Sequence, residues 1–471
     1  MSETKPVAQE ALAIPGPRGK EIWNGLMALS KHPLEYVQEL RSKYGDIVGM
    51  KFPFEYVVFL FNPEYIEHVL HRNYKNYVKQ TGRWRAFRDI IGNGLLSCDE
   101  PDWRPQRQRI QPSFNPDGLV KVAHTAVEQT EARMKKWEAV AETGKSIEML
   151  NEFFVLSLTI LTRALFGEAM DDKVPHFVTA LTNAHEYINP MALHNLIDPP
   201  RGLLKVVMPG YRRFDKSFQV MRGVVEEVIR HRKETGITGD DLLARIMLGR
   251  DEDTGTAMSS QQLLDEALTM VIAGHETTSL TLSFALLWMS RHPQIETTLR
   301  NELETVLKGR RPTQQDLPQL TYLRMVIQET MRLTPPAWGL DRKAVQDDFI
   351  GGYRIPGKAS VAISIYAIHR HPEYWERAEE FDPLRFTEER SKGRPECLFM
   401  PFGGGPRRCV GMRMAMMQME LMLATLLQDY KFKPVPGIPF ELRPMLNLRP
   451  RNGVWMTLHK LESRQAQAMN S

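Results

Sequence analysis

The chain has 471 residues, of which 42% are hydrophobic and 25% charged, so it is long enough to bury a sizeable core. Its net charge of +4 is small, and charges of both signs are interspersed, which gives no case for nucleic-acid binding. Cys98, Cys397 and Cys409 are too few and too irregularly spaced for a disulfide framework, a zinc site or an iron–sulfur cluster. Sparse cysteine fits a reducing compartment.

Neither end of the chain carries a membrane or export signal. Residues 1–18 are a polar, proline-punctuated lead-in without the apolar stretch of a signal peptide, and residues 462–471 are expected to form a flexible tail. No run of about 20 uncharged apolar residues occurs anywhere. We therefore expect no transmembrane anchor and a cytoplasmic location.

The first hundred residues alternate between helical and strand-like patterns. Residues 34–44 have helical periodicity, and residues 47–61 alternate and are rich in Val, Phe and Tyr, which predicts a β-hairpin. Residues 78–96 are predicted to be irregular, either as a surface loop with aromatic anchors or as a loop that covers a ligand pocket. Trp103 and Arg107 lie four apart, on one face of a predicted helix over 102–109, where such a pair is most often a surface cation–π contact.

A long helix is predicted over about 260–290, and its centre reads Ala-Gly-His-Glu-Thr-Thr. These are poor residues for the middle of an apolar helix. Ala273 and Gly274 would allow a flat ligand to approach, Thr277 could offer a hydroxyl to bound oxygen, and Glu276 could pass protons. The alternative is a kinked buried helix whose threonines bond back to the preceding turn, which accounts for Thr277 but not for the whole group.

A glycine-rich loop over 402–411 places Cys409 just before a predicted helix over 412–430. The N-terminus of a helix favours an anion, so we expect this position to stabilise a thiolate. Such a thiolate could be a nucleophile or an axial ligand of haem iron. The simpler alternative is a buried cysteine in a glycine-rich turn. Residues 431–458 are predicted to form β-hairpins.

Two of these segments resemble motifs of the cytochrome P450 family. The spacing Phe-x-x-Gly-x-Arg-x-Cys-x-Gly of its haem-binding loop is matched by Phe402, Gly405, Arg407, Cys409 and Gly411. Residues 273–278 match the family's oxygen-activation signature. The resemblance covers essentially the whole chain. It implies a mainly α, triangular, helix-rich domain with small β-sheets, formed as a single catalytic domain by residues 1–471.

The resemblance also implies roles for individual residues. Cys409 would be the axial ligand of haem b, Thr277 and Glu276 would deliver protons to bound O2, and His275 is not expected to bind iron. Glu329 and Arg332, three apart on a helix, would form a buried network with Arg385, although Leu384 stands where the family commonly has Glu. The haem contacts would be Trp103, Arg107, Ala273, Gly274, Arg342, Phe402, Arg407 and Gly411.

The implied activity is hydroxylation of an apolar small molecule, because the candidate pocket residues are mostly apolar. A fatty acid is the first expectation, followed by a terpenoid or a steroid. The alternatives are a peroxide-driven peroxygenase, which typically lacks the acid–alcohol pair, and a non-catalytic haem-binding protein. The candidate pocket residues are Trp84, Phe87, Ile90, Ala337, Trp338, Met445 and Leu446.

No flavin- or nicotinamide-binding segment is recognisable in the sequence, so electrons from NAD(P)H are expected to arrive through a separate ferredoxin or flavodoxin and its reductase. An acidic partner would dock near Arg394, Arg407 and Arg408. The protein is expected to be a monomer.

Overall fold

A computed structural model describes residues 12–52, 55–167, 177, 179–181, 211–236, 239–251 and 254–461. The chain divides into two compact units, which are described separately. Unit 1 comprises residues 1–82, 339–378 and 394–408, and unit 2 comprises residues 83–338, 379–393 and 409–471. The lead-in up to residue 11 and the tail from 462 lie outside the described residues, and one catalytic domain over 1–471 stays a prediction.

Unit 1 is built on a five-stranded sheet of order β1-β2-β8-β5-β3. Strands β1 and β2 form the predicted antiparallel hairpin, with Ile47 opposite Leu60, and β2 runs parallel to β8. Val37 and Leu40 of α2 share a hydrophobic cluster with Met50 of β1. The strands of unit 1 are β1 (Ile47–Lys51), β2 (Tyr56–Leu60), β3 (Tyr77–Val78), β5 (Leu340–Ala344), β6 (Asp348–Ile350), β7 (Tyr353–Ile355) and β8 (Ser360–Ile363).

Short helices surround the sheet within unit 1. The predicted helix over 34–44 is α2. The helices are α1 (Lys20–Lys31), α2 (Pro33–Tyr44), α3 (Pro63–Glu67), η1 (His68–Arg72), η2 (Tyr74–Asn76), α15 (Ile365–Ile368), η8 (Glu396–Leu398) and η9 (Gly405–Arg407).

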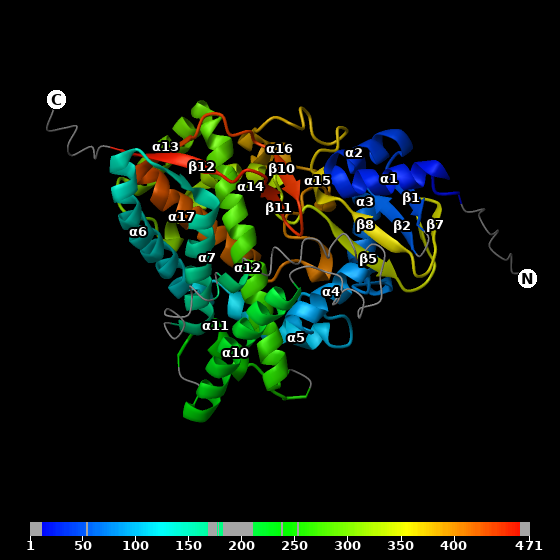
Figure 1. The fold of residues 1–471 in the computed structure, drawn as a ribbon, viewed down its shortest axis with the longest axis horizontal. Coiled ribbons are helices and arrows are strands. Elements are labelled where there is room, and N and C mark those ends of the chain that lie inside the picture. The colour runs from blue at the N-terminus through cyan, green and yellow to red at the C-terminus, as the bar shows by residue number, and fades with distance from the viewer. Residues whose placement is uncertain are drawn as a thin grey trace, which may run out of the picture. The chain divides into compact units, whose positions relative to one another are not determined.

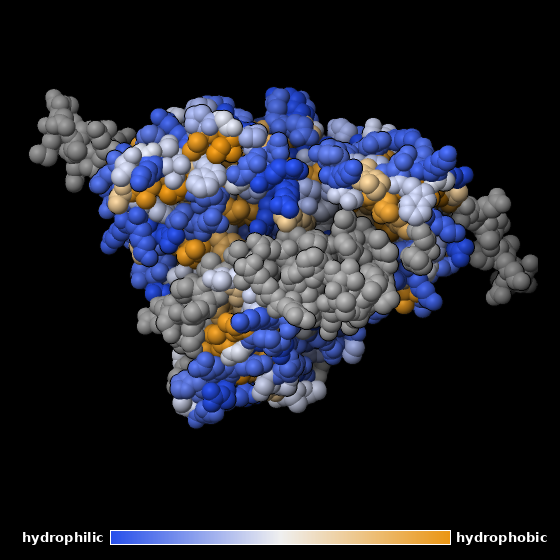
Figure 2. Space-filling model, in the orientation of Figure 1, coloured by the Kyte–Doolittle hydropathy of each residue, from blue (hydrophilic) through white to orange (hydrophobic). Residues whose placement is uncertain are grey.

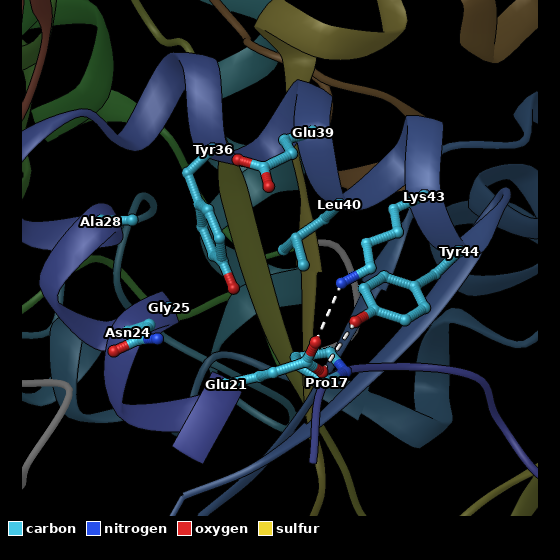
Figure 3. A pocket seen from close by; sticks show the side chains of 10 residues that line it. All are labelled: Pro17, Glu21, Asn24, Gly25, Ala28, Tyr36, Glu39, Leu40, Lys43 and Tyr44. Carbon is cyan, nitrogen blue, oxygen red and sulfur yellow. Dashed lines mark hydrogen bonds and ion pairs between the residues drawn. The ribbon is translucent and has the colours of Figure 1, made fainter. Parts of the chain in front are cut away.

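A hollow of about 260 Å³ lies between α1 and α2 (Figure 3). Lys43 Nζ lies 2.9 Å from Glu21 Oε1, and Tyr44 Oη donates to Glu21 Oε2 at 3.1 Å. A Cβ at Gly25 would lie 2.1 Å from Tyr36 Oη, so glycine there lets the two helices approach. The hollow contains none of the predicted site residues.

Unit 2 is mainly helical (Figure 1). Its small sheets are β4-β12-β9 and the hairpin β10-β11, which confirm the predicted β-structure at the C-terminal end. Its longer helices are α5 (Trp103–Ile110), α6 (Val120–Thr143), α7 (Met149–Phe166), α10 (Tyr211–Thr235), α12 (Ser260–Ser290), α13 (Pro293–Leu307), α14 (Thr321–Leu333) and α17 (Met412–Asp429). The shorter helices are η3 (Gln111–Phe114), η4 (Asp117–Leu119), α11 (Leu242–Leu248), η6 (Gln314–Gln319), η7 (Pro383–Phe386) and α16 (Glu388–Ser391). The strands are β4 (Ser146–Glu148), β9 (Tyr430–Pro434), β10 (Leu442–Pro444), β11 (Leu448–Pro450) and β12 (Trp455–Lys460).

The predicted long helix is α12, which runs alongside α7 (Figure 1). Ser259 and Gln262 close its first turn as a capping box. A Cβ at Gly274 would lie 3.0 Å from Leu161 Cδ2 of α7. A side chain at this position would require Leu161 to shift by a few tenths of an ångström, so glycine eases the packing of the two helices, and the expected approach of a flat ligand stays a prediction.

The prediction that residues 78–96 are irregular is wrong over most of its length. Gly82–Ile91 form the helix α4, which starts in unit 1 and continues into unit 2. Trp84 and Phe87 lie three apart, and their ring centroids are 5.6 Å from each other. Aromatic contacts at this spacing stabilise a helix, and the sequence interpretation gave them too little weight.

One helix in the described part of the chain, α7, is long and apolar enough to cross a membrane by length and composition. It is 61% buried and packs on α12, as a core helix would. The visible face in Figure 2 is largely hydrophilic, with hydrophobic residues in small separate groups.

Glu329, Arg332 and Arg385 meet inside unit 2. Arg332 Nε donates to Glu329 Oε2 at 2.7 Å, and Arg385 Nε lies 3.4 Å from Glu329 Oε1. The side chains of all three are 0–3% exposed. The Asp382 backbone N–H also donates to Glu329, so the carboxylate fixes residues 382–385 against α14.

Replacing Glu329 with Gln should lower the free energy of unfolding by about 3–5 kcal/mol, because Arg332 would keep a buried charge without its counter-ion. Urea unfolding of the holoprotein measures this. The matched control is Arg230→Ala, which breaks an exposed pair with Glu234 and should cost under about 1 kcal/mol. Equal losses in the two variants would contradict the role given to the buried network.

Candidate active site

Cys409 stands two residues before Gly411, the N-cap of α17. A hydrogen bond from the Gly411 backbone N–H and the charge of Arg107 both lower the pKa of its thiol, but desolvation outweighs them and raises that pKa. The surrounding protein thus removes more solvation than these two groups replace, and a stabilised thiolate at Cys409 stays a prediction.

The sulfur is nevertheless accessible. Cys409 is an exposed residue, although nearby protein atoms desolvate its thiol. A metal cation bonded to the sulfur would replace the lost solvation and remove the thiol proton. One accessible cysteine sulfur with one backbone donor fits an axial ligand of haem iron.

The glycines of the cysteine loop are required by its backbone and its packing in unit 1. Gly403 and Gly405 have φ values of 72° and 68°, in the region that favours glycine. A Cβ at Gly405 would lie 1.9 Å from the carbonyl oxygen of Leu70 in η1. The loop therefore rests directly on η1, and a larger residue at Gly405 would displace it. Phe402 is half-buried in the same loop.

Three arginines were predicted to contact haem, of which Arg107 belongs to unit 2 and Arg342 and Arg407 belong to unit 1. In unit 2, burial lowers the pKa of Arg107, and the nearby Cys409 sulfur opposes that shift. Trp103 is buried on the same helix. In unit 1, Arg342 is buried in β5 and donates to the Asp341 carbonyl oxygen at 2.8 Å, and Arg407 ends η9. Desolvated guanidinium groups suit the carboxylates of haem propionates.

One stripe of α12 borders open space. Ala273 is exposed, and Met270 and Thr277 are half-buried, in a helix whose other residues are mostly buried. Thr277 Oγ1 donates to the Ala273 carbonyl oxygen at 3.0 Å. A hydroxyl that donates to the backbone can still accept a hydrogen bond from water or bound oxygen. The back-bonding alternative for Thr277 is thus observed, and it does not exclude the predicted role.

Glu276 is held by the C-terminal hairpin. Its carboxylate is 2% exposed, accepts from Asn447 Nδ2 at 2.6 Å, and accepts from Arg449 Nε at 2.6 Å. The sequence interpretation missed both partners. Their spacing of two on a strand-like segment indicates that they share a face, but nothing local indicates which carboxylate they meet.

Four of the predicted pocket residues come together in unit 2. Trp338 Nε1 donates to the Met445 carbonyl oxygen at 2.8 Å, and the Leu448 backbone N–H donates to the Pro336 carbonyl oxygen at 2.8 Å. These bonds hold Ala337 and Trp338 beside Met445 and Leu446. Trp84 and Phe87 lie on α4, and the side chain of Ile90 lies outside the described residues.

His275 is fully buried, and its Nδ1 is hydrogen-bonded to the Val271 carbonyl oxygen at 2.6 Å. Its ring packs edge-on against Phe154 of α7, with centroids 4.5 Å apart. No cluster of three or more His, Cys, Asp or Glu side chains suited to a metal ion occurs among the described residues.

A second acid on α12, Glu266, was missed by the sequence interpretation. It is 1% exposed, and its Oε2 accepts from the Leu95 backbone N–H at 3.0 Å. Burial raises the pKa of Glu266 to about 8, and the neighbouring Asp265 adds to the shift. The only sequence signal was an acid in an otherwise apolar stretch.

An accessible cysteine sulfur, buried cations and a helix with an acid–alcohol pair define the haem-thiolate class of oxygenases. The cytochrome P450 family model matches residues 14–455, and the chain belongs to the cytochrome P450 family. It is therefore a cytochrome P450 monooxygenase, a class that uses haem iron with a cysteine thiolate and O2.

Relatives match along most of their length. Cyclooctatin synthase of Streptomyces melanosporofaciens is 31% identical, over 92% of this chain and 92% of the relative. Cyclooctat-9-en-7-ol 5-monooxygenase of the same organism is 30% identical, over 87% of each chain. The crystal structure of the cytochrome P450DA heme domain superimposes with a TM-score of 0.85 and 24% identity, over 97% of this chain and 99% of that one. The predicted fold class is confirmed.

The raised pKa of Glu266 predicts a pH-dependent stability. Between about pH 4.5 and pH 8 the folded protein keeps a proton that the unfolded chain has lost. The contribution of Glu266 to the free energy of unfolding is therefore largest below about pH 4.5. It should fall by on the order of 5 kcal/mol as the pH rises to about 8.

Glu266→Gln should flatten this dependence, as measured by urea unfolding between pH 5 and 8.5. Glu389→Gln, which changes an exposed carboxyl of α16, should keep the wild-type slope. If Glu266→Gln and the wild-type protein show the same slope, the assignment of a protonated buried carboxyl is refuted.

Proposed function

We propose that this monooxygenase hydroxylates a terpenoid in the cytoplasm. The observation that carries the proposal is the near full-length match to bacterial relatives named for oxidation of a terpenoid skeleton. The apolar and aromatic side chains of Trp84, Phe87, Trp338 and Leu446 support a polycyclic hydrocarbon ligand. A fatty acid, the first expectation from the sequence, has no specific support, and a steroid stays a further outcome of the test.

Cys409 would hold the haem iron through its sulfur, and Arg107, Arg342 and Arg407 would bind the propionates. When bound, the haem supplies O2 binding and the oxygen atom that enters the substrate. The protein holds the iron-binding sulfur, orients the haem through its carboxylates and excludes water from the reacting carbon. These assignments, together with Phe402, Trp103, Ala273, Gly274 and Gly411, are part of the proposal.

Thr277 and Glu276 would deliver protons to bound oxygen. The Thr277 hydroxyl lies on the open stripe of α12 and can hold a water molecule against bound oxygen. Glu276 directly precedes Thr277 in the chain, and its carboxylate is paired with Arg449 and Asn447. We propose that the Glu276 carboxylate takes up a proton from solvent and passes it to that water, and that pairing with Asn447 and Arg449 stabilises the carboxylate that remains.

Electrons would come from NAD(P)H through a separate ferredoxin or flavodoxin and its reductase, with the enzyme acting as a monomer. Arg408 is exposed, and Arg394 stacks over Trp375 with its guanidinium carbon 4.7 Å from the ring centroid. Together with Arg407 these unit 1 residues would receive an acidic partner.

The optical spectrum tests the cofactor and the substrate class together. The reduced protein with carbon monoxide should show a strongly red-shifted Soret band, and Cys409→Ser should lose it. Terpenoids should then shift the iron spin state and, with a ferredoxin, a reductase and NADPH, yield hydroxylated products. Spectral shifts and products with fatty acids alone would reject the terpenoid proposal, and turnover with peroxide but not with redox partners would indicate a peroxygenase.

Two adjacent threonines of α12 allow a matched test of the role proposed for Thr277 in proton delivery. Thr277 and Thr278 both donate to the carbonyl oxygen four residues earlier, at 3.0 Å, but only Thr277 lies on the open stripe. Thr277→Ala should lower the fraction of consumed NADPH that appears as product about tenfold, because proton delivery is impaired. Thr278→Ala should leave that fraction within about twofold. Similar losses in both variants would assign the threonines to helix structure alone.

A further inference from the structure

Near its N-terminal end, α12 holds two neighbouring polar atoms that are buried without a hydrogen-bond partner in the described structure. They are Glu266 Oε1 and Thr269 Oγ1. The residues lie three apart, so their side chains are neighbours on the helix surface. A buried donor or acceptor without a partner costs about 1–3 kcal/mol, so a native protein that keeps two together calls for a physical explanation.

The bonding of Thr269 differs from that of the other hydroxyl residues nearby. Thr277, Thr278, Ser279, Thr281 and Ser283 each donate to the carbonyl oxygen four residues earlier. Thr269 makes no such bond, although it is 6% exposed and could make one. A Cβ at Gly94 would lie 2.4 Å from Thr269 Oγ1 and 2.8 Å from the Asp265 carbonyl oxygen, so backbone of the 92–97 segment crowds the usual acceptor.

Asp265, which precedes Glu266, shows that the 92–97 segment can donate hydrogen bonds to a carboxylate. Asp265 accepts from the Asn93 backbone N–H at 2.9 Å and from Gln261 Nε2 at 2.6 Å, one bond on each oxygen. Glu266 has only its Oε2 bonded, to the Leu95 backbone N–H. The unsatisfied oxygen is therefore a property of this position and not of the whole segment.

Glu266 lies in line with the open stripe of α12, at its buried end. Residues 266, 270, 273 and 277 are spaced four, three and four apart, which places them in one line along the helix. Met270, Ala273 and Thr277 are the half-buried and exposed members, and Glu266 marks the buried end. Leu95, which bonds Glu266, follows closely after α4, the helix of the predicted pocket residues Trp84 and Phe87.

We propose that Glu266 Oε1 and Thr269 Oγ1 form a binding site for a hydroxyl group at the end of the substrate remote from Thr277. The inference rests on the proposed function and narrows it to an already oxygenated terpenoid. An alcohol both donates and accepts, which matches a protonated carboxyl beside a threonine hydroxyl. Burial favours the protonated form of Glu266 at neutral pH. A carboxylate or phosphate would meet the acids Glu266 and Asp265 and is disfavoured.

The spacing along α12 indicates the length that such a ligand would span. Thr269 and Glu266 lie eight and eleven residues before Thr277, or about 12 and 16 Å along the helix axis at about 1.5 Å per residue. That span suits a diterpenoid-sized molecule whose hydroxyl is at one end and whose reacting carbon is near Thr277. The reaction that supplies this substrate must therefore be one that installs a hydroxyl group on the hydrocarbon.

The test compares ent-kauran-16-ol with ent-kaurane, two diterpenoids that differ by one hydroxyl group. Dissociation constants are measured from the spin-state shift of the holoenzyme. The wild-type protein should prefer the alcohol. Thr269→Val and Glu266→Met should each reduce this preference about tenfold, whereas Glu266→Gln, which keeps both a donor and an acceptor, should retain most of it.

Controls separate this loss from general damage. Asp265→Asn changes an acid whose oxygens are already bonded, and Thr162→Val removes a buried hydroxyl that bonds back within α7. Both should keep the wild-type preference, and the carbon monoxide spectrum checks the integrity of every variant. The inference is overturned if both diterpenoids bind but the Thr269→Val and Glu266→Met variants keep the preference, since the atoms then hold only water. If neither diterpenoid nor any other terpenoid binds, the proposed function itself fails, and the inference fails with it.

Discussion

The close packing of α7 against α12 is the constraint on which unit 2 depends. Gly274 allows the contact with Leu161, His275 packs on Phe154, and Ser279 donates to the Phe153 carbonyl oxygen at 3.0 Å. These contacts occupy one side of α12 and fix its rotation. The opposite stripe, which carries Ala273 and Thr277, is thereby left facing open space. A side chain at Gly274 would crowd the Leu161 side chain, which would have to shift.

Polar groups inside this core are satisfied by segments distant in the sequence. Glu276 is paired with the β10–β11 hairpin, and Glu329 is paired with Arg332 and with the segment that carries Arg385. A buried charge is tolerated only with such partners, so each acid also fixes the segment that pairs with it. The hairpin that bonds Glu276 contains Met445 and Leu446, which lie beside Trp338. The predicted pocket residues and Glu276, the predicted proton donor, thus share one support.

The protein groups around Cys409 do not by themselves stabilise a thiolate. The desolvation of its sulfur outweighs the Gly411 hydrogen bond and the charge of Arg107, so the thiol keeps its proton more firmly than a free cysteine. A bound cation reverses that balance. The same surroundings that disfavour an isolated thiolate therefore favour a metal–sulfur bond, provided that the metal compensates for the missing water.

The sequence by itself determined the features whose signal is local. The spacing around Cys409, the acid and threonine in the centre of α12, the β1–β2 hairpin and the family fold can all be recognised from residue types at fixed intervals. The sequence did not reveal the α4 helix, because Trp84 and Phe87 in a basic segment resemble a loop with aromatic anchors. Nor did it reveal the purpose of Gly274, since its neighbour Leu161 is more than a hundred residues away.

Only the tertiary structure decided which charged and polar groups meet. Asn447 and Arg449 reach Glu276 across the chain, and the 92–97 segment bonds Glu266 while leaving one of its oxygens and the Thr269 hydroxyl without a partner in the described structure. The physical reason is that periodicity reports which face of a helix is buried, whereas the pairing of a buried polar atom depends on the segment that folds onto that face.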